Sequence, residues 1–284
     1  MSDTPQPIPR ETFDPTAYRQ KELEKQKKSE MSFVDHIDVF RKHLIRGIIA
    51  TVIFTALAFA FNDILIDKIL FGPTHSDFWT YQVLCNVSDA LCFDLPETPL
   101  QNRKVSGQFT LHISSSLIAG IILAFPYIFF ELWRFIRPAL YNKEEQVTKG
   151  TVFFVSILFM MGILFGYYII APLTYSFFVG YSVSSQIVNN FDTSSYFSII
   201  GSLILICGLM FELPMVSYFL AKAGLLQAET MATKRKIAIV IILFLAAVFT
   251  PPDIFSQLLI ALPIVLLYEL SIIIVRRVNK TQIA

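Results

Sequence analysis

Six long apolar segments restrict this chain of 284 residues to folds in which lipid takes the place of water as the solvent. Crossing a bilayer core of about 30 Å takes about 20 helical residues, and all the segments but one come close to that length or exceed it. Hydrophobic residues make up 54% of the chain. We therefore predict an all-α integral membrane protein whose spans lie near residues 45–62, 108–130, 151–179, 196–221, 237–249 and 254–275.

The fifth segment, IAIVIILFLAAVF, is shorter than the others, with 13 residues before Thr250. As a helix it reaches roughly 20 Å, so it must thin the bilayer or shelter behind neighbouring helices. The distribution of positive charges nevertheless requires it to cross. If it did not cross, Arg276, Arg277 and Lys280 would lie on the side opposite to the other positively charged connections.

Of the 23 Lys and Arg residues, 20 fall on one side of the predicted membrane and three on the other. Positive residues accumulate on the cytoplasmic side of membrane proteins, so both termini are predicted to be cytoplasmic. Residues 1–30 and 278–284 are then cytoplasmic tails around a membrane domain at 31–277. Within residues 32–46, apolar residues recur at helical spacing, which predicts an amphipathic helix at the membrane surface that leads into the first span.

Cysteine and proline positions add local expectations. Cys85 and Cys92 share the long connection at 63–107, which is predicted to face outward. They would form a disulfide if that side is oxidising, and otherwise they would remain free thiols. Proline inside an apolar span predicts bent helices with freed carbonyl groups, and this applies to Pro126, Pro172, Pro214 and Pro263.

Glu212 is the most informative polar residue, because it lies ten residues before Lys222 in an apolar span. That places it roughly 15 Å from the cytoplasmic edge, where a carboxylate is costly unless it faces protein or water or is protonated. Two interpretations remain open. Glu212 is either a protonated structural residue bonded inside the bundle, or a polar docking point for another helix or a substrate.

Other polar residues receive simpler interpretations. Glu131 is expected to pair locally with Arg134, and Glu269 is expected to snorkel or to pair internally. His112 is expected to be a hydrogen-bonded core residue. The connection 131–145 ends in Glu144 and Glu145, and it is either a solvated charged run or a rim carboxylate able to bind arginine bidentately.

No catalytic or metal-binding motif is present in the sequence, so we expect neither an enzyme nor a cofactor, and nothing in the charge pattern indicates nucleic acid. The alternative function at this point is a small-solute or ion transporter that uses Glu212 as a proton or cation carrier. The sequence shows no internal repeat of the kind common in such transporters.

Four stretches together resemble one family. HIDVFRKHL (36–44), ELWRFIRPALYNKEE (131–145), FELP (211–214) and TPPDIFSQLLIALPIVLLYEL (250–270) are similar, in order and spacing, to the TatC subunit of the twin-arginine protein translocase. The resemblance covers about residues 32–277. It implies a concave, glove-like bundle of six helices in a membrane, with a bacterial inner membrane favoured over an organellar one.

The resemblance also implies a function and partners. Proteins of this family recognise signal peptides with paired arginines on folded cargo and assemble with single-span TatA-like and TatB-like subunits. Export is then driven by the proton-motive force. Oligomers and contact with membrane lipid are expected as well.

Matching the motifs residue by residue implies particular roles. Glu144 matches the acid that contacts the signal arginines, and Arg41, Phe135, Pro138 and Leu140 match neighbouring motif positions. Glu212 matches an acid on the concave side that engages partner helices. Pro73 and Asp253 match outer-loop positions with structural roles.

One position departs from the family pattern. The family places a Glu two residues before the motif Arg, where this chain has Val39, and the acid here is Asp38 immediately before it. On a helix this difference turns the carboxylate by about 100°. Asp38 is therefore expected either to substitute in part for the missing Glu or to leave more of the arginine recognition to Glu144.

Overall fold

The structure is a computed structural model, and it describes residues 33–88, 92, 100–140, 148–184, 186, 189–249 and 253–283. These residues are nearly all helical. In the part of the chain that the structure describes, extended pairing is limited to one isolated parallel bridge between Gln101 and Asp192. The prediction of a helical protein is confirmed for these residues.

The first half of the chain begins with α2 (Phe33–Ala60) and returns in α4 (Gly107–Leu140). Between them lie the π-helix η1 (Asp63–Leu70), the 3-10 helix η2 (Gly72–Thr74) and α3 (Trp79–Val87). The next long segment consists of α5 (Thr148–Phe165), the π-helix η5 (Gly166–Ile170) and α6 (Ala171–Gly180).

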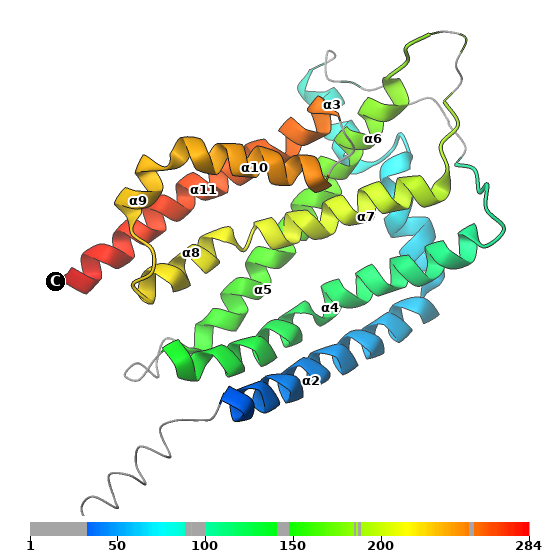
Figure 1. The fold of residues 1–284 in the computed structure, drawn as a ribbon. Helices are drawn as coiled ribbons and strands as arrows, with labels where there is room; N and C mark the ends of the chain where they lie inside the picture. Colours follow the sequence, from blue (N-terminus) through cyan, green and yellow to red (C-terminus); the bar gives the residue numbers. More distant parts are fainter. Residues whose placement is uncertain are drawn as a thin grey trace, which may run out of the picture.

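The second half begins with α7 (Thr193–Met210) and α8 (Leu213–Lys222), followed by the short α9 (Ala228–Thr233). It ends with α10 (Arg235–Phe249) and α11 (Ile254–Ile283). The start of α2 and the end of α11 lie at the same end of the bundle (Figure 1), which we call the terminal end. The opposite end, which holds η1, α3 and the end of α6, is called the loop end.

Five helical segments are long and apolar enough to cross a membrane, counted over the residues that the structure describes. They are Ile37–Ala60, Gly107–Ile136, Gly150–Gly180, Thr193–Lys222 and Ile254–Lys280. The remaining apolar segment of the sequence forms α10, which has 15 residues and is shorter than these five. The chain is therefore a multi-pass helical membrane protein.

At the terminal end, residues from Phe33 onward form a helix that leads without a break into the first span as α2, as expected. One expectation there needs correction. Residues 131–140 were expected to belong to a connection between spans, but they form the last turns of α4. The helix persists because a partner is available: the ring of Phe135 packs on Phe40 of α2, with centroids 5.1 Å apart.

Helices α2 and α4 pack closely along their length. A Cβ atom at Gly120 of α4 would lie 2.7 Å from the backbone nitrogen of Thr55, so only glycine permits this approach. Toward the loop end, His112 Nε2 hydrogen-bonds to the carbonyl oxygen of Phe59 at 3.1 Å, and the two rings stack. His112 is therefore hydrogen-bonded, as expected, but it is half-buried at the helix interface and is not a core residue.

Small residues at the end of α5 and the start of η5 allow close packing on α7 in the same way. A Cβ atom at Gly162 would lie 2.6 Å from the carbonyl oxygen of Cys207, and one at Gly166 would lie 2.9 Å from the Cα atom of Ile204. Small residues at this spacing favour close helix contact in membranes. Here the contact is internal to the chain.

Hydrogen bonds from tyrosine hydroxyl groups hold the segments of the loop end together. Tyr81, which is only 1% exposed, donates hydrogen bonds to the carbonyl oxygens of Pro73 and Pro172, at 2.9 and 3.0 Å. Tyr196 donates to the carbonyl oxygen of Leu70, and Tyr167 donates to that of Ile69. The accepting carbonyl groups of Ile69, Leu70 and Pro73 lie in the short helices η1 and η2, and that of Pro172 lies in the first turn of α6.

Asp192 joins two loops at this end. Its carboxylate caps the start of α7 by accepting from Ser194 and Ser195, and it also accepts from the backbone of Arg103. Desolvation alone would raise the pKa of this carboxyl, but the three backbone N–H donors and the charge of Lys104 together outweigh it and lower the pKa below its ordinary value.

Candidate functional site

The first predicted site residues lie on the opening turns of α2 at the terminal end. Asp38 and Arg41 form an ion pair of 3.7 Å between side chains that are 56% and 68% exposed, respectively. A pair at this spacing on one helix face is weak because water screens it. Both groups are therefore available to exchange partners.

Phe135 joins this group from α4. Its ring lies 5.1 Å from that of Phe40 and 6.4 Å from that of His43, centroid to centroid. Tilted aromatic pairs at such distances are favourable beyond the area they bury. The contact therefore brings Phe135 to the same end of the bundle as Asp38 and Arg41, although the two segments are almost a hundred residues apart in sequence.

The other predicted residues of this surface are less completely described. Pro138 and Leu140 lie in the last turns of α4, where the structure gives the backbone helix but not the side chains. Glu144 lies outside the described residues. The expected carboxylate therefore follows α4 by four residues of sequence after Leu140.

A buried polar cluster beside this surface went unnoticed at the sequence level. Glu131 of α4 hydrogen-bonds to His43 Nδ1 of α2 at 2.5 Å and lies 3.7 Å from Arg46 of α2. Tyr127, one turn earlier on α4, donates to the same carboxylate at 3.1 Å. The expectation of a local pair with Arg134 is replaced by this bonding across the helix interface.

Glu212 lies at a break between helices. α7 ends at Met210, and α8 begins at Leu213 with Pro214 in its first turn. Because Pro214 has no N–H group and its ring displaces the preceding turn, a continuous helix is disfavoured here, as the sequence predicted. The Glu212 side chain does not cap α8.

The Glu212 carboxylate is largely enclosed. The residue is 9% exposed, and its Oε1 atom has no hydrogen-bond partner among the residues that the structure describes. An ionised carboxylate oxygen in that state is costly, so Glu212 is either protonated within the bundle or meets a polar group of another chain.

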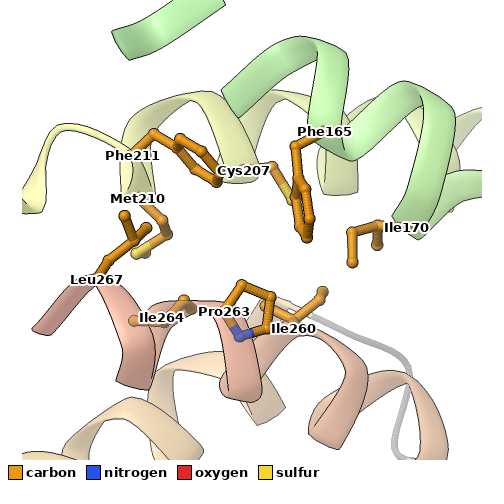
Figure 2. A pocket seen from close by; sticks show the side chains of 9 residues that line it. All are labelled: Phe165, Ile170, Cys207, Met210, Phe211, Ile260, Pro263, Ile264 and Leu267. Carbon is orange, nitrogen blue, oxygen red and sulfur yellow. The ribbon is translucent and has the colours of Figure 1, made fainter. Parts of the chain in front are cut away.

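The space beside this break is apolar and almost filled. Side chains from α5, from α7 and from Pro263 and its neighbours in α11 converge on a cavity of about 10 Å³, at the lower limit for a single water molecule (Figure 2). Phe211, next to Glu212 in sequence, forms one wall. The nine side chains that line this cavity supply no polar partner for the carboxylate.

The two predicted outer-loop residues both lie at backbone turns. Pro73 is buried in η2, and its carbonyl oxygen accepts from Tyr81. Asp253 precedes α11, and its Oδ1 atom accepts from the backbone of Ser256 at 2.6 Å, which is the bonding of a helix N-cap.

A disulfide joins Cys85 and Cys92 at the loop end, while Cys207 is a buried free thiol. The sequence left the state of the first two cysteines open. Disulfides persist in oxidising compartments, so the loop end is compatible with an outward-facing side. At the other end, Glu269 of α11 pairs with Arg235 of α10 through two contacts of 2.7 and 2.9 Å, so its expected internal pairing is confirmed.

Together, the long apolar helices, one of them broken at a buried carboxylate, define a polytopic helical membrane protein. Comparison with known proteins identifies its family. Residues 35–263 match the family described as Sec-independent protein translocase protein (TatC).

Curated relatives and solved structures agree with that match. The chain is 38% identical over 265 residues to the Sec-independent protein translocase protein TatC of Blattabacterium sp. subsp. Periplaneta americana, covering 91% of this chain and 100% of the relative. It is 34% identical to the TatC protein of Desulforapulum autotrophicum, covering 88% of this chain and 86% of that one.

Two crystal structures of the twin-arginine translocase receptor TatC have the same fold. One superposes with a TM-score of 0.68 at 31% identity, covering 86% of this chain and 99% of the other. The second, determined in the detergent DDM, gives a TM-score of 0.70 at 33% identity, with coverage of 84% and 98%. The chain belongs to the TatC family of twin-arginine protein translocase subunits, which confirms the resemblance seen in its motifs.

Proposed function

We propose that this chain is the receptor subunit of a twin-arginine translocase and binds the signal peptides of folded proteins. The observation that carries the proposal is the contact between Phe40 and Phe135, which brings the Asp38–Arg41 pair beside the end of α4. Glu144 follows the last residue of α4, Leu140, by four residues of sequence. A surface with carboxylates and an apolar floor suits a peptide that carries paired arginines next to an apolar stretch.

Glu144 is proposed as the main partner of the signal arginines. A carboxylate can accept two parallel hydrogen bonds from one guanidinium group, which gives specificity over lysine. Asp38 is proposed to supply part of the negative charge that the family places at the position of Val39. Its weak pair with Arg41 can open for an incoming arginine, and Phe135, Pro138 and Leu140 would contact the apolar part of the peptide.

Glu212 is proposed as the docking point for polar groups of partner helices. The support is its position at a helix break, its burial and the lack of a hydrogen-bond partner for its Oε1 atom among the described residues. The partners would be single-span TatA-like and TatB-like subunits, which assemble with this chain into an oligomer in contact with membrane lipid. Transport of the folded cargo would then be driven by the proton-motive force, without a cofactor or a catalytic step in this chain.

The proposed topology has six spans in a concave, glove-like bundle with both termini in the cytoplasm of a bacterium, embedded in its inner membrane. Helix α10 would be a short sixth crossing, and Pro73 and Asp253 would stabilise outer loops. The charge asymmetry of the sequence supports this orientation, and so does the Cys85–Cys92 disulfide at the loop end.

The test is crosslinking of the full chain in membrane vesicles to a twin-arginine signal peptide, with a twin-lysine peptide as the competitor. Glu144→Ala should abolish capture of the twin-arginine peptide and export of its cargo, while insertion into the membrane is unchanged. Glu229→Ala removes an exposed carboxylate on α9 and serves as the matched control. Undiminished capture by Glu144→Ala would refute the site. Uptake of a small solute that depends on Glu212 would instead favour a transporter.

A further inference from the structure

The buried polar cluster between α2 and α4 has no part in the function proposed above. It comprises Glu131 and Tyr127 of α4 with His43 and Arg46 of α2, and we call it the clasp. The side chain of Glu131 is 5% exposed and that of His43 is 13% exposed, whereas Arg46 is 50% exposed and reaches the cluster from outside.

A carboxylate so well enclosed within a membrane-spanning segment needs partners, because desolvation penalises its charge. Glu131 has three: a hydrogen bond from the imidazole, one from the tyrosine hydroxyl and the nearby guanidinium charge. Removing one partner of a buried charge is much more costly than the net contribution of the pair, so the cluster strongly favours one relative placement of the two helices.

The clasp adjoins the proposed peptide surface directly. Glu131 and Phe135 are four residues apart on α4, and Phe40 and His43 are three apart on α2, so each pair lies on one helix face. The clasp and the aromatic contact are thus successive layers of one interface. The imidazole of His43 lies in both layers, since it bonds to Glu131 and its centroid is 6.4 Å from that of Phe135.

We infer that Glu131 is a positioning residue for signal-peptide recognition. Through His43 it fixes the register of α2 against α4 at the terminal end, and this register sets where Asp38 and Arg41 stand relative to Phe135. The inference rests on the proposed function. The positioning role accounts for the hydrogen-bonded charge of Glu131 at an interface between two helices that apolar side chains could have filled instead.

The role is local, because other contacts already hold the two helices together. Close approach at Gly120 and the bond from His112 to Phe59 lie further toward the loop end and do not involve the clasp. Loss of the clasp should therefore free only the first turns of α2 and the last turns of α4. The membrane domain should keep its fold.

The experiment measures binding of fluorescent twin-arginine and twin-lysine signal peptides to the full chain in vesicles. Glu131→Ala should weaken twin-arginine binding on the order of tenfold, the factor that about 1.4 kcal/mol of lost binding free energy produces. His43→Ala should have a similar effect, and the double variant should add little, because both changes break the same contact. Export of the cargo at a saturating precursor concentration should fall much less than the apparent affinity for the twin-arginine peptide.

His112→Ala is the matched control, since it removes a polar contact between the same two helices at a distance from the peptide surface. It should leave peptide binding unchanged. Equal weakening by His112→Ala and Glu131→Ala would overturn the positioning role, as would normal binding by Glu131→Ala. If Glu131→Ala does not accumulate, Glu131→Gln, which keeps an acceptor but loses the charge, takes its place with the same criteria. A wild-type chain that fails to prefer the twin-arginine peptide would instead refute the proposed function.

Discussion

The contact of α5 with α7 gives a prediction whose size follows from the structure. Replacing Gly162 with alanine would place a Cβ atom 2.6 Å from the carbonyl oxygen of Cys207 and 2.8 Å from the Cα atom of Gly208. Both are backbone atoms, so no change of rotamer relieves the clash. Because ordinary contact begins near 3.4 Å, α7 must move by roughly 0.8 Å at this point.

Overpacking of this kind lowers the free energy of unfolding by about 1–3 kcal/mol. The measurement is unfolding of the purified full chain in mixed detergent micelles, compared with Gly180→Ala. No atom lies within 4 Å of a Cβ atom built at Gly180, so this variant shares the loss of glycine entropy in the unfolded chain but has no clash. If the two variants agreed within about 0.5 kcal/mol, close backbone packing at Gly162 would be refuted.

Two further predictions concern the loop end. Because backbone N–H donors lower the pKa of Asp192, its ionised form stabilises the fold above the pKa of the unfolded chain, and this contribution is lost as the pH falls through the folded pKa. The difference in thermal midpoint between wild type and Asp192→Ala should therefore shrink at acid pH, and a constant difference would contradict the sign. Without reductant, the denatured chain should take one maleimide mass tag, at Cys207, and with reductant it should take three. Three tags without reductant would show that Cys85 and Cys92 are not joined.

The sequence predicted bends at four prolines, and at Pro214 the structure has a break, with α7 ending at Met210 and α8 beginning at Leu213. Pro126 and Pro263 instead lie inside the unbroken helices α4 and α11, so the missing N–H group alone did not decide where a helix ends. The internal pairing of Glu269 was anticipated too, although its partner was not: Arg235 comes from another helix, 34 residues away. Sequence indicates that a charge in a span needs a partner, but it does not indicate which one.

The partner of Glu131 illustrates the same limit. Arg134 was the nearest cation in sequence, yet the carboxylate faces α2 and bonds to His43. A signal was present, since His43 and Arg46 are three residues apart and therefore share a face of α2. It became interpretable only once α2 and α4 were known to be neighbours. For Glu144, which lies outside the described residues, the assignment is still a prediction.

The sequence alone determined that the chain is a helical membrane protein, where most of its spans lie and which family its motifs resemble. These properties follow from hydropathy and from the spacing of residues along one helix, and both are local quantities. Only the tertiary structure decided that α4 extends to Leu140 and that Glu131 is held by α2. These depend on which surfaces meet across long sequence separations, where packing against a neighbour outweighs the preferences of the segment itself.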